Sequence, residues 1–389
     1  MKKIDIEKIT SWHNNNCQKE LDIRHLTLEQ MQPYIEGLGS LFKVEKIGKS
    51  HQGRDIHKIV FGEGDSRILL WTQMHGNEST TSKAIFDFLK FLRQKKDFQD
   101  EIGMFLDTFT IFLIPILNPD GAERYTRENA NSMDLNRDAR LLSQKESIIL
   151  NKIFESVRPS LCLNLHGQRT IYGLENGLSA SVSFLAPAAN KERSLTNSRE
   201  TAMKHIIRMN NVLQQYIPNQ VGRYDDSFNE NCVGDSFQMQ GVPTILFEAG
   251  HYKDDYQREK TRMFIFYAFL ELFGITAISE NPENSDAYFT IPENKENYKD
   301  LVLRNARIGQ YKDPVDIAVQ YSEILQDRDI KFEAYIDTIG ECNSIYGHRE
   351  VDLEGDSILI NSQEKIEVGQ KVSTIVKKNE SSVTIFPKK

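Results

Sequence analysis

Four short apolar runs stand out in the hydrophobic pattern between residues 42 and 275, and each run ends at a group of polar residues. They cover residues 67–73, 109–117, 161–165 and 243–247. Continuous apolar runs of this length are typical of strands that are buried on both faces of a mainly parallel sheet. The pattern therefore predicts four buried, mainly parallel strands.

Segments with helical spacing alternate with these runs. Between residues 80 and 95, apolar side chains recur on one helical face at Ile85, Phe88, Leu89 and Leu92. Similar spacing occurs at 148–157, 203–216 and 255–273. Strands that alternate with helices predict an α/β fold with a covered sheet. Ligands in such folds bind beyond the carboxyl ends of the strands, which is where the polar groups of this sequence stand.

The pattern changes at both ends of this region, and we expect four parts in the chain. Residues 1–40 form a polar, helical N-terminal lead-in, and residues 41–275 form the α/β domain. Residues 276–299 hold two prolines and few apolar side chains, which indicates a linker. Residues 300–389 form a small C-terminal β-rich domain, with strands expected at 331–336, 357–360, 365–368, 372–376 and 383–386.

Composition narrows the classes of function. The 389 residues include 48 Lys and Arg against 56 Asp and Glu, a net charge of −8, which argues against a nucleic-acid partner. No apolar stretch reaches the ~18 residues that indicate a membrane span, and no apolar segment follows the N-terminal lysines as in a signal peptide. The four cysteines are widely spaced. We therefore expect a cytoplasmic protein with no membrane partner.

Three residues near the run ends have the side chains of a catalytic zinc site, which usually has three protein ligands. His75 and Glu78 are separated by two residues after the first run, and His166 follows the third run. Gly76 would let the backbone bend sharply between the first two ligands. The alternative is a solvated loop histidine beside a helix-capping glutamate, with His166 as a hydrogen-bonded core residue. The shared placement at run ends favours one zinc ion per chain.

Other polar groups could serve such a metal. Glu248 ends the fourth run, where a carboxylate is costly unless it is paired or at an open strand end, and it could act as a general base. Arg127 and Arg137 follow the second run and could bind an oxyanion and a substrate carboxylate. His251, which follows Glu248 closely, could contact the residues that bind the metal without binding the metal itself. A strand-end salt bridge and a solvated charged loop are the plainer alternatives for these residues.

The order and rough spacing of these motifs resemble those of the zinc carboxypeptidase family. The matching residues are His75-Gly76-Asn77-Glu78, Asn118-Pro119-Asp120-Gly121, Arg127, Asp134-Leu135-Asn136-Arg137, His166-Gly167 and Phe247-Glu248. The match spans residues 45–275. The resemblance implies a mixed, mostly parallel eight-stranded sheet with helices on both faces.

The same resemblance implies roles for individual residues. His75, Glu78 and His166 would bind zinc, Glu248 would be the catalytic base and Arg127 would stabilise the oxyanion. Asn136 and Arg137 would hold the C-terminal carboxylate of the substrate. The mobile tyrosine of the family has only a loose counterpart in Tyr224. The acidic-aromatic pair that usually lines the side-chain pocket is Asp235-Ser236, which lacks the aromatic residue.

We therefore expect a metallocarboxypeptidase that removes the C-terminal residue of a peptide by a promoted-water pathway, with Glu248 deprotonating the attacking water. The alternative is a zinc-dependent deacylase of N-acylated amino acids, similar to the succinylglutamate desuccinylase and aspartoacylase branch. Both substrates carry a free carboxylate. A zinc-binding protein without activity is disfavoured, because such proteins commonly lose the base that Glu248 provides here.

Overall fold

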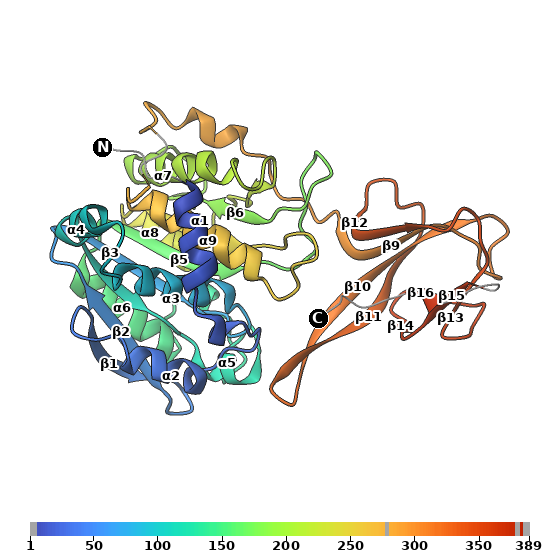
Figure 1. Cartoon of the computed structure of the whole chain (residues 1–389), viewed down its shortest axis with the longest axis horizontal. Coiled ribbons are helices and arrows are strands. Elements are labelled where there is room, and N and C mark those ends of the chain that lie inside the picture. Colours follow the sequence, from blue (N-terminus) through green and yellow to red (C-terminus); the bar gives the residue numbers. More distant parts are fainter. Residues whose placement is uncertain (1–5, 277–279, 378–381, 384–389) are drawn as a thin grey trace. The chain divides into compact units, whose positions relative to one another are not determined.

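The computed structural model describes residues 6–276, 280–377 and 382–383, and these residues form two compact units (Figure 1). The first, here the α/β unit, comprises Met1–Gln168, Ser181–Gly250 and Gln257–Glu293. The second, here the β-rich unit, comprises Arg169–Ala180, His251–Tyr256 and Asn294–Lys389. The four-part division stays a prediction, since these units are interleaved along the chain.

An eight-stranded sheet forms the centre of the α/β unit, in the order β1-β2-β4-β3-β5-β8-β6-β7. The pairs β4/β3, β3/β5, β5/β8 and β6/β7 are parallel and the other three are antiparallel. This confirms the predicted mixed, mostly parallel sheet. The strands are β1 (Lys43–Lys49), β2 (Asp55–Phe61), β3 (Ser66–Thr72), β4 (Phe109–Ile114), β5 (Leu161–Gly167), β6 (Val182–Leu185), β7 (Val221–Arg223) and β8 (Thr244–Ala249).

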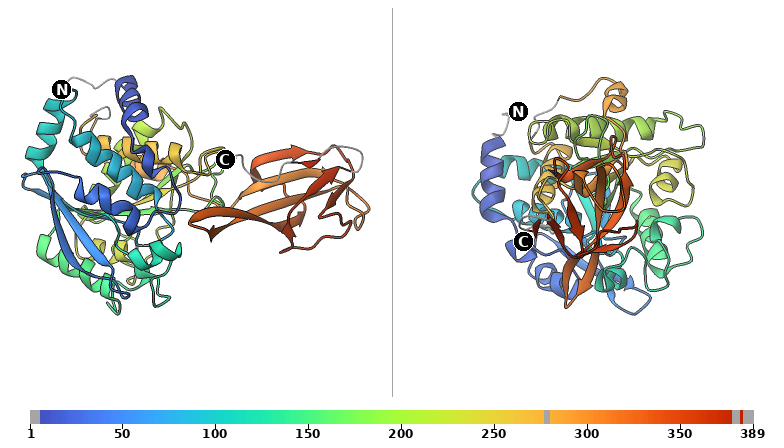
Figure 2. Two further views of the ribbon diagram at one scale, coloured as in Figure 1. Left: turned by 60° about the horizontal axis from the view of Figure 1, so that its bottom comes forward. Right: turned by 90° about the vertical axis from the view of Figure 1, so that its right-hand side faces the viewer.

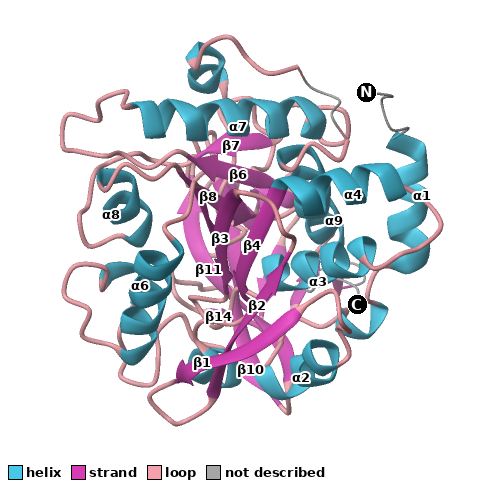
Figure 3. Cartoon of the chain, turned by 90° about the vertical axis from the view of Figure 1, so that its left-hand side faces the viewer, coloured by secondary structure: helices cyan, strands magenta, loops and turns pink. Residues whose placement is uncertain are grey.

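Helices cover both faces of this sheet, as predicted. Figure 3 shows α6 and α8 on one side of the strands and α3, α4 and α9 on the other. None of the helices in the described residues is long and apolar enough to cross a membrane. The helices are α1 (Ile6–Asn16), α2 (Leu28–Glu36), α3 (Thr80–Leu92), α4 (Gln99–Thr108), α5 (Pro119–Arg124), α6 (Lys145–Val157), α7 (Asn197–Leu213), α8 (Val233–Met239) and α9 (Glu259–Leu272), with short 3₁₀ turns η1 (Lys19–Leu21), η2 (Leu135–Arg137) and η3 (Asp286–Thr290).

The four apolar runs correspond to β3, β4, β5 and β8, which lie side by side at the centre of the sheet in the order β4-β3-β5-β8. The strands that the pattern did not predict lie toward the edges of the sheet. β1 is exposed or half-buried along its whole length, and β7 has only three residues. Strands of this kind bury too few side chains in sequence to give a continuous apolar run.

The turn that carries His75 and Glu78 packs directly on the segment that begins α5. A Cβ atom built on Gly76 would lie 1.9 Å from the carbonyl carbon of Gly121. The side chain of Asn118 joins the two segments, because its Nδ2 donates to the Met74 carbonyl at 3.1 Å while its Oδ1 accepts the Gly121 N–H at 2.9 Å.

Gly76 is therefore needed for a different reason than the sequence suggested. Its φ angle is not positive, and the left-handed residue of this turn is Gln73, with φ 42°. The constraint at Gly76 is the close approach of two backbones rather than a bend that only glycine can make.

The β-rich unit contains a five-stranded sheet in the order β12-β9-β10-β11-β14 and a three-stranded sheet in the order β13-β15-β16. The long hairpin of β10 and β11 can be followed in Figures 1 and 2. Side chains such as Leu301, Ile317 and Ile336 form the hydrophobic core of the β-rich unit. The strands are β9 (Tyr298–Ala306), β10 (Val315–Gln326), β11 (Asp329–Gly340), β12 (Tyr346–Asp352), β13 (Ile358–Ile360), β14 (Lys371–Val372), β15 (Ile375–Lys377) and β16 (Ser382–Val383).

The strands predicted in this region are partly confirmed. Residues 331–336 lie in β11, residues 358–360 form β13, and residues 372–376 contribute to β14 and β15. Residues 365–368 form no strand, and β9, β10 and β12 were not predicted. Of the run at 383–386, only Val383 lies within the described residues.

Two segments from the middle of the chain are built into the β-rich unit through Asp300. Its carboxylate, which is 1% exposed, accepts the hydroxyl of Tyr256 at 2.8 Å and that of Thr170 at 3.2 Å. It also accepts the backbone N–H of Tyr321 at 2.7 Å and a hydrogen bond from Gln320. A buried carboxylate requires such donors, so residues 169–180 and 251–256 are part of the folded β-rich unit.

We expect Gly76→Ala to lower the free energy of unfolding by about 2 kcal/mol, because the added methyl group overlaps backbone atoms that cannot move independently. Urea denaturation measures this change. The matched control is Gly103→Ala in α4, where an added Cβ meets nothing within 4 Å. This control should be neutral or slightly stabilising in a helix. Equal stability of Gly76→Ala and the wild type would contradict the close approach.

A candidate metal centre

The predicted ligands and the predicted base lie at the carboxyl ends of three neighbouring strands. His75 follows β3, while His166 and Glu248 lie near the ends of β5 and β8. His166 and Glu248 are direct partners in the parallel pairing of β5 with β8. Glu78 stands just before α3. Its backbone N–H donates to the His75 carbonyl at 3.2 Å and closes the turn between the two residues. Residues more than 170 positions apart thus meet at one sheet edge.

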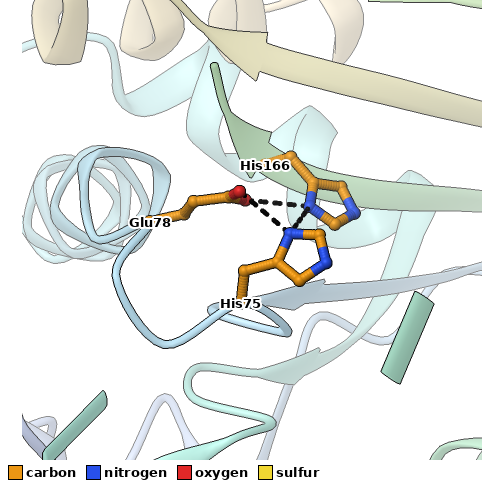
Figure 4. Close-up of side chains that lie close together, drawn as sticks. All are labelled: His75, Glu78 and His166. Carbon is orange, nitrogen blue, oxygen red and sulfur yellow. Dashed lines mark hydrogen bonds and ion pairs between the residues drawn. The ribbon is translucent and has the colours of Figure 1, made fainter. Parts of the chain in front are cut away.

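Three side chains converge on a small space at this edge (Figure 4). Nδ1 of His75 lies 2.9 Å from one oxygen of Glu78, and Nδ1 of His166 lies 2.9 Å from the other. The two Nδ1 atoms are 3.1 Å apart. The N–H of Gly167 also donates to Glu78 at 3.0 Å. Both histidines are 2% exposed, so the group is shielded from bulk water.

The hydrogen bond between His75 and Asp134 determines the tautomer of His75, and so which ring nitrogen directs a lone pair into the cluster. Nε2 lies 2.9 Å from Oδ1 of Asp134, which as a carboxylate accepts the proton of Nε2. Nδ1 is then left with a lone pair, directed at the carboxylate of Glu78 and at Nδ1 of His166. Two imidazole nitrogens and a carboxylate that face one another in this way are a donor set for a metal ion, and the fit to zinc is good.

The electrostatics of the cluster agree with a cation site. Burial would raise the pKa of Glu78, but the neighbouring histidines hold it well below its ordinary value. Burial lowers the pKa of His166. Burial also opposes the charged form of His75, yet Glu78 and Asp134 together raise its pKa. The lowered pKa of Glu78 favours its charged form, and positive charge is favourable beside it.

Glu248 is a second carboxylate of the site, and it is buried. It is 8% exposed, and its Oε2 has no hydrogen-bond partner among the described residues. Burial raises its pKa well above the ordinary glutamate value, and the charge of Glu78 raises it further, while Arg127 acts in the opposite direction. A carboxyl group with a raised pKa next to a metal site is suited to accepting a proton.

Arg127 lies against the same cluster. Its Nε and Nη2 lie 3.1 and 3.0 Å from Oδ2 of Asp134. Its Nη1 is 3.2 Å from Nδ1 of His75 and 3.5 Å from Glu78. The guanidinium thus forms one side of the cluster, with 43% of the side chain exposed. Donors that are both held in place and accessible can stabilise a developing negative charge.

Asn136 and Arg137 lie on the same segment, in η2. Oδ1 of Asn136 accepts the N–H of Val233 at 3.2 Å, at the start of α8. This leaves the amide NH₂ of Asn136, a donor, to face other groups. The Arg137 side chain is exposed, and its Nη1 donates to the Asn136 carbonyl at 2.9 Å. Both residues therefore present donors, which suits the binding of a carboxylate.

The structure does not bring every predicted residue to this cluster. Tyr224 follows the edge strand β7, two strands away from Glu248, and its N–H donates to the Phe184 carbonyl at 3.0 Å. Its role stays a prediction. His251 is packed inside the β-rich unit, where its ring lies 4.2 Å from that of His348.

Asp134 belongs to this site, although the motifs did not indicate a role for it. It joins His75 to Arg127, and these two partners hold its pKa far below the ordinary value against the effect of burial. A signal for it was present, because metal-binding histidines usually donate their second N–H to a carboxylate. The sequence offered many carboxylates for that task, and only the fold selects Asp134.

Comparisons with known proteins agree with this geometry. A family model described as zinc carboxypeptidase matches residues 31–216. Carboxypeptidase M of Mus musculus is 27% identical over 205 residues, which cover 45% of this chain and 45% of that protein. Carboxypeptidase D of Homo sapiens is 22% identical over 213 residues, covering 46% of this chain and 15% of that protein. The chain thus spans less than half the length of these curated relatives.

A solved structure supports the fold. The crystal structure of a metallo-carboxypeptidase from Burkholderia cenocepacia matches with a TM-score of 0.51 and 15% sequence identity, covering 64% of this chain and 70% of that one. At this identity the likeness shows the fold alone. The matched family model, the ordered motifs and the converging side chains agree with one another: over residues 31–216 this chain is similar to the zinc carboxypeptidase family.

Proposed function

We propose that this protein is a zinc-dependent metallocarboxypeptidase, which hydrolyses the last amide bond of a peptide with a free C-terminal carboxylate. The observation that carries the proposal is the pairing of His166 with Glu248 on adjacent strands. This pairing sets a buried carboxyl group with a raised pKa beside a ready set of metal ligands. A general base requires this combination of position and proton affinity.

His75, Glu78 and His166 would hold one zinc ion per chain. When bound, zinc supplies a Lewis acid and lowers the pKa of a coordinated water toward neutrality. Asp134 orients the ring of His75 for this task, and the Gly167 N–H holds one oxygen of Glu78 in place. The remaining chemistry belongs to the side chains around these ligands.

Glu248 takes a proton from the attacking water and later passes it to the nitrogen of the leaving amine. Arg127 donates hydrogen bonds to the oxyanion that develops on the scissile carbonyl. Asn136 and Arg137 bind the terminal carboxylate of the substrate. A peptide that is blocked at its C-terminus leaves these donors without a partner, so we propose that the enzyme rejects it.

No specific observation favours the alternative, a deacylase of N-acylated amino acids. The relatives reported above are carboxypeptidases. A panel of peptides and acyl-amino acids distinguishes the two activities, and turnover of acyl-amino acids alone would refute the peptidase proposal. All four cysteines are free, which supports our further proposal of a reducing, cytoplasmic location.

We predict that His75→Ala abolishes stoichiometric zinc binding, because it removes one of three ligands together with the link to Asp134. Equilibrium dialysis of the apoprotein should give one zinc per chain for the wild type and a large loss of affinity for the variant. His51→Ala, which changes an exposed turn residue, is the control. Full zinc content in His75→Ala would refute the ligand assignment.

Glu248→Gln should lower kcat for a peptide substrate by at least about a hundredfold, since the amide cannot accept a proton from water. Zinc content should stay the same, because Glu248 is not one of the three ligands. The exposed Glu283→Gln serves as control and should keep full activity. Near wild-type hydrolysis by Glu248→Gln would exclude the proposed mechanism.

Arg137→Lys should lower kcat/KM for a free-carboxylate peptide roughly tenfold, because lysine offers a point charge in place of a bidentate fork. The wild type should also prefer the free carboxylate over the same peptide with a C-terminal amide, and the variant should lose most of this preference. Arg140→Lys, three residues further on and paired with Glu230, is the matched control. An unchanged preference in Arg137→Lys would show that the carboxylate is bound elsewhere.

A further inference from the structure

The segment between α5 and α6 carries four of the residues discussed above: Arg127, Asp134, Asn136 and Arg137. Apart from η2 it has no regular secondary structure, so no helix or strand ladder holds it in place. Catalytic groups must nevertheless be held to within a fraction of an ångström of their working positions. The contacts that hold this segment therefore matter for the chemistry.

Asn129 closes a tight bend between Arg127 and Asp134. Its backbone N–H donates to the Met133 carbonyl at 3.0 Å, and its carbonyl accepts the N–H of Ser132 at 3.0 Å. Its side-chain Oδ1 accepts the N–H groups of Asn131 and Met133, at 2.9 and 3.1 Å. One side chain thus fixes both limbs of the bend.

The other end of the same amide attaches the bend to the body of the α/β unit. Nδ2 of Asn129 donates to Oε1 of Gln144 at 2.9 Å and to Oε2 of Glu146 at 3.3 Å. Glu146, at the start of α6, also accepts the N–H of His51 at 3.0 Å. Asn129 and Glu146 are both 0% exposed. Their hydrogen bonds are thus sheltered from competition with water.

The bend determines how Arg127 and Asp134 face each other. Asp134 accepts from Arg127 through Oδ2 and from Nε2 of His75 through Oδ1. A shift of the bend would move the guanidinium and the partner of the metal ligand together. The following residues have separate support, since Asn136 accepts the N–H of Val233 and the Ala139 N–H donates to the Asn231 carbonyl at 3.2 Å.

We propose that Asn129 is a positioning residue of this enzyme: through its amide, anchored on Gln144 and Glu146, it sets Arg127 and Asp134 against the metal ligands. This inference rests on the proposed function for its effect on catalysis. Its effect on the segment itself and on metal affinity does not depend on any substrate.

The hydrogen bond from the Asn129 amide to the Glu146 carboxylate can be tested by exchanging donor and acceptor between the two residues. Asn129→Asp keeps the shape of the side chain but places an acceptor against the oxygens of Gln144 and Glu146, so two buried carboxylates repel each other. Glu146→Gln alone replaces one of two accepting oxygens with an NH₂ donor, so either the Asn129 amide or the His51 N–H then faces a donor. The double variant restores one donor and one acceptor across the pair, so a double-mutant cycle reports the interaction itself. Glu155→Gln, on an exposed part of α6, is the matched control.

The first measurement needs no substrate. We expect Asn129→Asp to speed amide hydrogen exchange of residues 125–134 by at least about tenfold, with β5 and β8 unchanged. The dissociation constant of the apoprotein for Zn²⁺ should rise roughly tenfold, because Asp134 orients a ligand. The double variant should recover most of both effects.

The second measurement separates kcat from KM on a free-carboxylate peptide. Asn129→Asp should lower kcat roughly tenfold or more, because Arg127 acts on the transition state. KM should change by less than about threefold, because Asn136 and Arg137 keep their own supports. Loss through general unfolding would instead reduce the active fraction, with no recovery in the double variant.

The possible results separate the positioning role of Asn129 from the proposed function of the protein. Unchanged exchange and zinc affinity in a folded Asn129→Asp would overturn the positioning role, as would faster exchange with unchanged kcat. Failure of the double variant to recover would also overturn it. If Asn129→Asp does not fold, Glu146→Gln must show the same changes on a smaller scale, and their absence would refute the proposal. A wild type that hydrolyses no peptide would refute the proposed function, while exchange and zinc affinity would still decide the role of Asn129.

Discussion

The carboxylate of Glu78, whose side chain is 11% exposed, is the group on which the rest of the site depends. Its two oxygens meet one nitrogen from each histidine, and a backbone N–H from Gly167 holds one of them. A charged carboxylate at this depth is stable only when its partners are already in place. These partners come from the end of β3 and from β5, which are neighbours in the sheet. The strand order of the sheet centre therefore places the partners that the Glu78 carboxylate needs.

Much of this could be predicted from sequence because buried parallel strands and their ends leave a local signal. The runs before His166 and Glu248 are continuous and apolar, and the polar residues stand where each run stops. The fold class followed from the same pattern, and family motifs supplied the number of strands. Half-exposed strands such as β1 leave no such signal. Their positions are set by pairing with β2, which is a tertiary contact.

The contacts that the sequence could not reveal are those between segments that are distant in the chain. Nothing near Gly76 indicates that the backbone of Gly121 will approach it. Nothing near His75 indicates that Asp134, among 56 acidic residues, will be its partner. The same holds for Asp300, which binds Thr170 and Tyr256 and so brings two mid-chain segments into the β-rich unit. Composition predicts a linker at residues 276–299, but hydrogen bonds decide which residues fold together.

The two carboxyl groups of the site must be considered together. The lowered pKa of Glu78 favours its ionised form, and the charge of that form adds to burial in raising the pKa of Glu248. Arg127 acts against this rise, yet the pKa of Glu248 stays well above its ordinary value. A raised pKa favours the protonated form of Glu248, and positive charge near Glu78 would lower that pKa again. The converging lone pairs of His75 and His166 mark where a divalent cation would supply it. The residues that would bind the metal would thus also control the pKa of Glu248. Removal of the metal would raise this pKa again and weaken Glu248 as a base.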